Sequence, residues 1–198
     1  AVADGNGKSD ELNPAAFIMN EVQRFVDFYS EPNMSSDEIK RMLKAAVHSA
    51  NRVLVAYKKA KGDNDSKMCF SSFDLTALYN EDDFITVHIG DTRTYLVRQE
   101  KLHQLTKDHT EAQRLCDEGK ISKGQIFTHP DRDILTSVLG IDTPNIDIRV
   151  GKVKKGDILA FIYSNDEEKG NQAVEDLQEV YEISKEPVKK EDIILGII

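Results

Sequence analysis

The chain has 198 residues, of which 39% are hydrophobic and 31% are charged, and its formal net charge is −9. These values predict a soluble globular protein with a substantial core, organised as one domain over residues 1–198. They exclude a membrane-spanning protein, because no apolar run approaches the roughly 20 residues that a transmembrane helix needs. They also argue against a nucleic-acid binder, because no cluster of lysine and arginine is interleaved with aromatic residues.

Cysteine content and the first residues bear on the cellular compartment. Two cysteines, Cys69 and Cys116, are too few for a disulfide framework. The opening residues lack the basic start and the long apolar stretch of a signal peptide. Together these features predict a protein of the reducing cytoplasm.

The N-terminal part of the chain predicts the tail of a buried strand, a glycine-rich turn and two long amphipathic helices. Asn13 is a helix N-cap residue followed by proline at the first helical position, and apolar residues at helical spacing follow it. Ser35, with Glu38 three residues later, fits a capping box that starts the second helix. The apolar face of this second helix continues to about Lys59.

From residue 70 onward the apolar period changes to the alternation that is typical of strands. The predicted strands are residues 73–79, 83–89, 93–98, 101–105, 145–150 and 157–163, with a final β-run at 192–198. The predicted helices are residues 110–117, ended by Gly119, residues 131–139, ended by Gly140, and residues 171–182. Residues 120–129 are polar and predict a surface flap. Helices followed by hairpins, without regular βαβ alternation, predict an α+β fold.

Three short motifs indicate chemistry. The first is a strand, a tight Gly-Asp turn and a second strand, Val87-His88-Ile89-Gly90-Asp91-Thr92-Arg93-Thr94-Tyr95-Leu96. The second follows in an acidic loop, Leu105-Thr106-Lys107-Asp108-His109-Thr110. The third is Val2-Ala3-Asp4-Gly5-Asn6-Gly7, in which a carboxylate precedes glycines that let the backbone approach an ion. Carboxylates and main-chain carbonyls hold hard cations in this way, although such a string alone could equally form an ordinary turn.

Residues 111–140 follow these motifs and contain the flap and a Leu-Thr-Ser-Val-Leu-Gly segment. In this order, the motifs and this stretch resemble the type 2C, metal-dependent serine/threonine protein phosphatases of bacteria. The resemblance implies an α-β-β-α sandwich of two antiparallel sheets flanked by helices. It also implies that Asp4 bridges two manganese or magnesium ions and that the Gly5 carbonyl helps to bind one. Asp108 would be a ligand of an outer, more weakly bound third ion. Asp91 would mainly shape its turn near the metals, with direct ligation as the alternative.

The same resemblance implies the reaction. Metal ions would activate a water molecule, which would attack the phosphorus of a phosphoserine or phosphothreonine in a phosphoprotein. No protein nucleophile is needed, and no Cys-x5-Arg loop surrounds either cysteine. His109 and His129 lie near these motifs, and we expect both to form hydrogen bonds rather than to ligate metal.

Several positions depart from the family pattern. Asn165 stands where a bridging aspartate belongs, and an amide brings no negative charge to a pair of divalent cations. Asp166 could replace it after a one-residue slip. Glu191 aligns with a ligand aspartate and keeps its charge on a longer side chain. The family's first strand, with an arginine for phosphate and a Glu-Asp pair for metal, is not among these residues.

These departures leave two further hypotheses beside the working phosphatase. One is a catalytically impaired pseudophosphatase that acts as a regulatory or phosphoprotein-binding module. The other is an unrelated α+β protein, which would make the ordered motifs a coincidence. The sequence does not specify the oligomeric state or the phosphoprotein.

Overall fold

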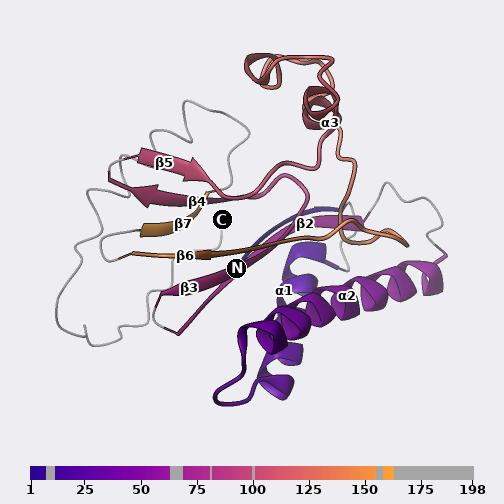
Figure 1. The fold of residues 1–198 in the computed structure, drawn as a ribbon. Coiled ribbons are helices and arrows are strands. Elements are labelled where there is room, and N and C mark those ends of the chain that lie inside the picture. Colours follow the sequence, from indigo (N-terminus) through magenta and orange to yellow (C-terminus); the bar gives the residue numbers. More distant parts are fainter. Residues whose placement is uncertain (8–11, 63–68, 81, 100, 155–157, 163–198) are drawn as a thin grey trace.

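The computed structural model describes residues 1–7, 12–62, 69–80, 82–99, 101–154 and 158–162, and the elements named below lie within these ranges (Figure 1). Two antiparallel sheets stack on each other, one with strand order β1-β2-β3-β6 and the other with order β5-β4-β7. The elements are β1 (Val2–Gly7), α1 (Pro14–Tyr29), α2 (Ser36–Ala60), β2 (Cys69–Tyr79), β3 (Asp83–Ile89), β4 (Arg93–Arg98), β5 (Lys101–Gln104), α3 (Glu111–Asp117), η1 (Lys123–Gln125), β6 (Asp147–Lys152) and β7 (Ile158–Ile162).

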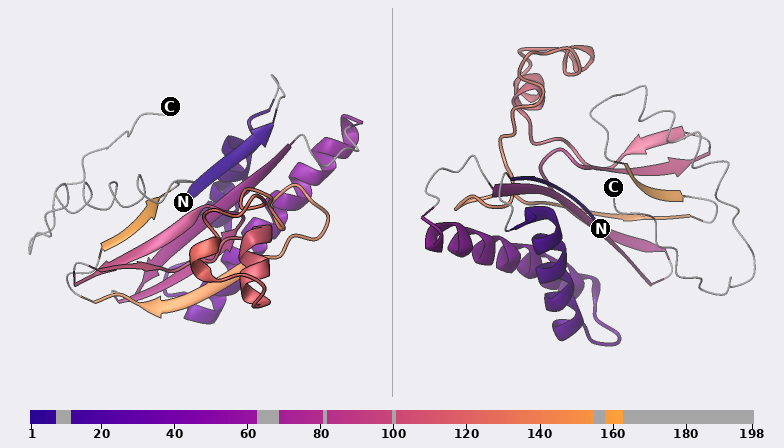
Figure 2. Two further views of the ribbon diagram at one scale, coloured as in Figure 1. Left: turned by 90° about the horizontal axis from the view of Figure 1, so that it is seen from above. Right: turned by 180° about the vertical axis from the view of Figure 1, so that it is seen from behind.

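Both long helices begin where their caps predict. The Asn13 side chain accepts a hydrogen bond from the Ala16 amide at 3.1 Å, with Pro14 at the first helical position. Ser35 and Glu38 form the reciprocal capping box that starts α2. The two helices cover the outer face of the β1-β2-β3-β6 sheet, and Figure 2 shows the same layering from behind. The prediction of two amphipathic helices in one layer is therefore confirmed.

Residues of β3 alternate between two environments, as a pleated strand requires. One set packs with buried residues of α1 and α2 in the larger core: Ile85, Val87 and Ile89. The other set faces the second sheet: Phe84, Thr86 and His88. Among the described side chains, Phe84, Leu96 and Leu105 form an apolar cluster between the sheets, and polar groups such as His88 share this interior.

The strands agree closely with the alternation in the sequence. The strands β3 and β4 have their predicted bounds. The strand β2 starts earlier than predicted, at Cys69, because its first residues pair with β1. The predicted helix at 171–182 and the β-run at 192–198 lie outside the described residues.

The predicted helix at residues 131–139 is wrong. This segment instead forms turns and two isolated bridges, Ser71 with Leu139 and Thr110 with Leu135. The Ser71 amide donates to the Leu139 carbonyl oxygen at 3.0 Å, and the Ser71 carbonyl oxygen accepts from the Leu139 amide at 2.9 Å. Pairing with a distant strand thus satisfies backbone groups that a local helix would otherwise have satisfied.

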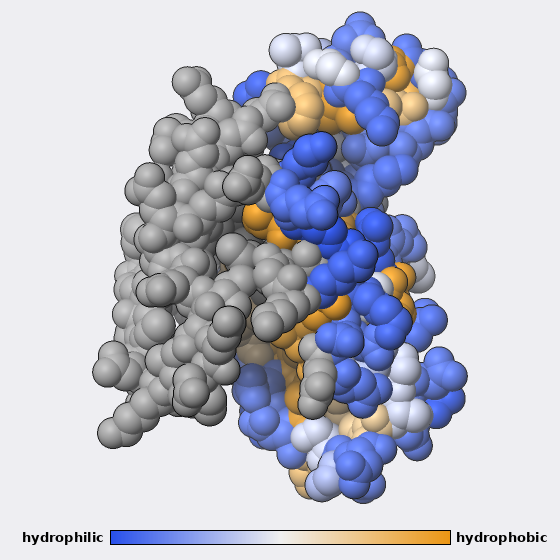
Figure 3. All heavy atoms as spheres, turned by 60° about the vertical axis from the view of Figure 1, so that its left-hand side comes forward, coloured by the Kyte–Doolittle hydropathy of each residue, from blue (hydrophilic) through white to orange (hydrophobic). Residues whose placement is uncertain are grey.

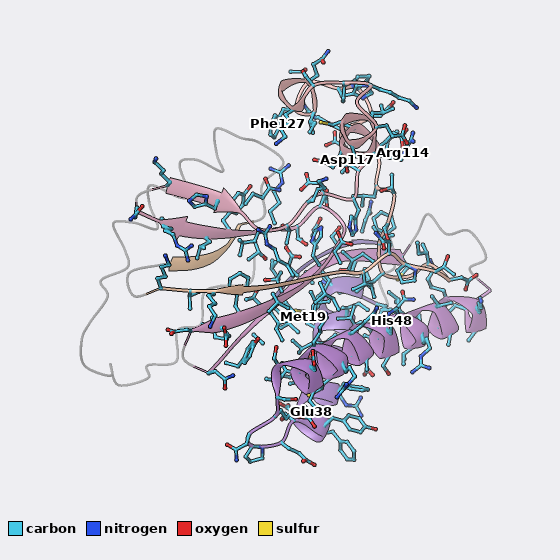
Figure 4. The ribbon with its side chains drawn as sticks, viewed as in Figure 1. Met19, Glu38, His48, Arg114, Asp117 and Phe127 are labelled. Atoms are coloured by element: carbon cyan, nitrogen blue, oxygen red, sulfur yellow. The ribbon has the colours of Figure 1, made fainter. Side chains whose placement is uncertain are left out.

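The segment that contains α3 and η1 projects from the sandwich as a flap (Figures 1 and 2). We define the flap as residues 111–133. Figure 3 shows some apolar surface at the top of the molecule. Phe127, which Figure 4 labels on the flap, is 38% exposed. The prediction of a surface flap after Gly119 is confirmed. Within the described ranges, no helix combines the length and apolar character needed to cross a membrane.

Candidate metal and phosphate site

The three sequence motifs meet at one end of the sandwich. Asp4 lies opposite Ser72 in the register of β1 and β2. The Ser72 hydroxyl donates to Asp91 Oδ1 at 2.7 Å and accepts from the Asp91 amide at 3.3 Å. Gly90 makes this contact possible: its φ is +98°, and a Cβ there would lie 2.1 Å from Ser72 Oγ. Ser72 therefore connects the strand that bears Asp4 to the Gly-Asp turn.

The surroundings of Asp4 differ from the prediction in one respect. We expected it at the end of a buried strand, whereas β1 continues through the glycines to Gly7 and Asp4 is half-buried in mid-strand. The strand continues because every residue from Val2 to Gly7 has a partner on β2. Gly5 has a packing role here, since a Cβ would lie 2.7 Å from the Ala15 amide nitrogen of α1.

Carboxylates from all three motifs influence one another at this end. Burial raises the pKa of Asp91, its hydrogen bond from Ser72 opposes the shift, and the charges of Asp108 and Asp4 raise the pKa further. The net result is a pKa above its ordinary value. A cation bound near Asp91 would favour its ionised form.

Asp108 forms a bidentate ion pair with Arg93. Arg93 Nε donates to Oδ1 at 2.8 Å, and Nη2 donates to Oδ2 at 2.5 Å. Burial lowers the pKa of Arg93, but its hydrogen bonds and ion pairing with Asp108 outweigh that effect and raise it above the ordinary value. The guanidinium is therefore charged, and the pair ties the start of β4 to the acidic loop.

A small pocket of about 40 Å³ opens beside this ion pair. Its lining combines the turn, the acidic loop and the flap: Asp91, Arg93, Asp108, Thr110, Ile126, Phe127, Arg132 and Asp133. The Phe127 ring centre lies 5.8 Å from the Arg93 guanidinium carbon, within reach of a cation–π interaction. Figure 4 shows Phe127 on the opposite side of the flap from Arg114. The flap thus contributes directly to the site.

A buried polar network supports the Gly-Asp turn from between the sheets. His88 Nδ1 lies 2.5 Å from Asp74 Oδ1, and His88 Nε2 lies 2.8 Å from the Lys107 carbonyl oxygen. Thr94 Oγ1 donates to the other Asp74 oxygen at 3.3 Å. Burial lowers the pKa of His88, but the Asp74 carboxylate and the Lys107 carbonyl outweigh it and raise the pKa.

Sequence reasoning did not identify this network. The available signal was the pair of polar residues Thr86 and His88 at alternate positions of an otherwise apolar strand. Such positions face the same side of a sheet. Because Asp74 is the register partner of His88 on β2, a correct pairing of the two strands would have brought them together.

The two histidines expected to form hydrogen bonds do so. His109 Nδ1 accepts from the Gly90 amide at 3.2 Å, and its Nε2 lies 3.2 Å from Asp147 Oδ2. Burial and the charge of His88 lower the pKa of His109, against an opposing effect of Asp147. His129 Nδ1 accepts from the Asp131 amide at 3.1 Å.

The predicted metal ligands divide into two groups. Asp4, Gly5 and Asp108 lie toward the same end of the sandwich, as does Asp91, which was predicted mainly to shape its turn. Asn165, Asp166 and Glu191 lie outside the described residues, so their assignment stays a prediction. Within the described ranges, no three or more histidine, cysteine, aspartate or glutamate side chains gather closely enough to hold a metal ion.

Comparison with known proteins identifies the class that this fold and site define. A family model described as protein phosphatase 2C matches residues 1–128, and the chain belongs to this family. The predicted resemblance and the α+β sandwich fold are confirmed.

Particular relatives are bacterial phosphatases. The chain is 27% identical over 143 residues to the serine/threonine phosphatase stp of Listeria monocytogenes, which covers 71% of this chain and 55% of the relative. It matches the structure of the S. agalactiae serine/threonine phosphatase with a TM-score of 0.70 and 24% identity, over 80% of this chain and 64% of that one. The catalytic domain of PstP in complex with two manganese ions matches with a TM-score of 0.62 and 24% identity, over 78% and 62% of the two chains. The chain thus spans about half of the curated relative's length.

Proposed function

We propose that this chain is a metal-dependent phosphatase that removes phosphate from phosphoserine and phosphothreonine in proteins. One observation carries the proposal: the Asp91 carboxylate accepts a hydrogen bond from Ser72, the residue opposite Asp4 on β2, so the carboxylates of two separate motifs lie near each other. A pocket lined by Asp91, Asp108 and two arginines, Arg93 and Arg132, lies at the same place. Carboxylates for cations beside guanidinium groups for phosphate oxygens suit phosphate ester hydrolysis.

The proposed cofactors are manganese or magnesium, with two ions expected. Asp4 and the Gly5 carbonyl would hold them together with Asn165, Asp166 and Glu191, which lie outside the described residues. When bound, such ions activate water for attack on phosphorus and neutralise phosphate oxygens. Manganese is bound in the PstP structure to which this chain is similar.

The chain's own residues would position the site. Ser72 fixes the Asp91 carboxylate, and Gly90 allows the turn to lie against Ser72. His109 Nδ1 accepts a hydrogen bond from the Gly90 amide and so fixes the turn. We also propose that the substrate is a phosphoprotein, that residues 1–198 act as one domain, and that the protein works in the cytoplasm. The last proposal draws support from Cys69 and Cys116, neither of which forms a disulfide.

A second function, a phosphoprotein-binding module without turnover, is favoured by two observations. Asn165 replaces the charge expected at a bridging position, and Arg93 occupies both oxygens of Asp108. Each reduces the negative charge available to divalent cations.

Hydrolysis of p-nitrophenyl phosphate with manganese separates the two functions. The parent chain would be assayed beside Asp4→Ala and Asn165→Asp, with folding checked by circular dichroism. Manganese-dependent turnover that Asp4→Ala abolishes supports the phosphatase. Turnover only in Asn165→Asp supports a disabled site and the binding module. No hydrolysis by any of the three folded proteins contradicts the proposed activity.

A further inference from the structure

Asp108, the predicted ligand of a third metal ion, already pairs with a cation in this structure, the Arg93 guanidinium. Its side chain is 8% exposed and that of Arg93 is 15% exposed. Arg93 contacts both carboxylate oxygens, and Gln104 Nε2 donates to Oδ1 at 3.4 Å. A buried carboxylate needs such compensation, because water no longer solvates its charge.

We propose that the Arg93 guanidinium is the resident cation of Asp108, and that Arg93 and a divalent ion exclude each other at this carboxylate. The inference deepens the proposed function by stating how the outer metal position is regulated. It concerns only the competition for Asp108, so it does not depend on turnover.

Geometry supports the exclusion. A bidentate guanidinium uses both carboxylate oxygens in one plane, which leaves a metal ion no oxygen without a close cationic neighbour. A divalent ion at Asp108 would also lie close to a guanidinium that is itself largely buried, where like charges repel strongly. Binding of the ion therefore requires Arg93 to move away.

Other contacts hold Arg93 in place. Its Nη1 donates to Tyr95 Oη at 3.4 Å, and the Phe127 ring lies against the guanidinium. Moving Arg93 would break these contacts as well as the ion pair. The Arg93 side chain thus balances the charge at Asp108. The contact between Arg93 and Phe127 of the flap therefore does not depend on metal concentration.

The test is Mn²⁺ binding by electron paramagnetic resonance of the free ion. The parent would be compared with Arg93→Gln, with Asp108→Asn, and with the double variant. We expect Asp108→Asn alone to bind as the parent does. We expect Arg93→Gln to gain an additional Mn²⁺ site, at least about tenfold tighter than any binding of the parent at Asp108, and the double variant to lose it again.

Arg114→Gln is a matched control. Arg114 also pairs with both oxygens of a carboxylate, that of Glu111, but at the surface, where its own side chain is 45% exposed (Figure 4). Water can solvate the released Glu111 carboxylate, so we expect no comparable new site. Arg93→Lys keeps one charge without the bidentate geometry and should show an intermediate gain.

Thermal unfolding covers the case in which Arg93→Gln is poorly folded without metal. Mn²⁺ should then raise its melting temperature more than that of the parent. Unchanged Mn²⁺ binding in folded Arg93→Gln, or a loss of Mn²⁺ in Asp108→Asn with Arg93 intact, would overturn the inference. Turnover is read separately: a parent without activity whose Arg93→Gln variant gains the site refutes the proposed function and leaves this inference standing.

Discussion

Replacing His88 by alanine should destabilise the fold far more than replacing its partner Asp74 by asparagine. His88 is 2% exposed and Asp74 is fully buried. His88→Ala removes the contact at 2.5 Å, and the hydrogen bond that Thr94 Oγ1 donates to the Asp74 carboxylate at 3.3 Å remains. Removing one partner of a buried ion pair costs about 3–5 kcal/mol, because an uncompensated charge remains.

Asp74→Asn should cost less, about 1 kcal/mol, since it keeps a hydrogen bond while removing the charge. The asparagine amide can donate to Nδ1 of a neutral His88, whose Nε2–H still donates to the Lys107 carbonyl oxygen. Urea unfolding followed by circular dichroism measures both losses, because each is a sizeable part of a typical stability of about 5–15 kcal/mol.

The pH dependence follows from the raised pKa of His88. The folded protein keeps this proton at pH values where the unfolded chain has released it. The pair's contribution is therefore complete below about pH 6.5, the unfolded value, and is lost as pH rises through the raised folded pKa. The stability difference between parent and Asp74→Asn should shrink over that rise. An equal loss in His88→Ala and Asp74→Asn, or a difference that grows with pH, would refute this reasoning.

Four further substitutions test local packing and hydrogen bonding. Gly90→Ala should lower the free energy of unfolding by about 2–5 kcal/mol, because of backbone strain and overpacking against Ser72. Gly119→Ala, also at positive φ but in open space, should lower it by about 1–2 kcal/mol. Thermal unfolding measures both losses. Asn51→Ala should cost about 1–3 kcal/mol by urea unfolding, because its side chain binds the Gly140 amide at 2.7 Å, and an unchanged midpoint would argue against that bond. Phe127→Ala should change the unfolding free energy by less than about 1 kcal/mol, since it loses only an accessible cation–π contact, and a larger loss would show that the flap supports the whole fold.

Local signals predicted the long helices α1 and α2 and the central strands β3 and β4 well. The capping residues of α1 and α2 act within one helical turn, and the alternation along β3 and β4 depends on one buried face. The helix predicted at residues 131–139 was wrong because Leu139 and Leu135 pair with Ser71 and Thr110, which lie far away or in a loop. Sequence periodicity carries no information about such pairing.

The candidate site was predictable in its parts but not in its connections. Asp4, Asp91 and Asp108 were recognised from their motifs. The pairing of Asp108 with Arg93 depends on how the acidic loop folds over β4, and the pairing of His88 with Asp74 depends on strand register. Both follow from tertiary geometry rather than from spacing along the chain.

The central proposal is that Asp4, beside the Gly-Asp turn, belongs to a metal-dependent site for phosphoprotein hydrolysis. Its most direct test is phosphate release from a phosphothreonine peptide over a manganese titration, with the parent chain and Asp4→Ala side by side. Our account predicts release that rises with manganese in the parent and is reduced at least about 100-fold in Asp4→Ala, as expected when transition-state charge stabilisation is lost. Equal release by both proteins, or release that does not respond to manganese, would contradict it.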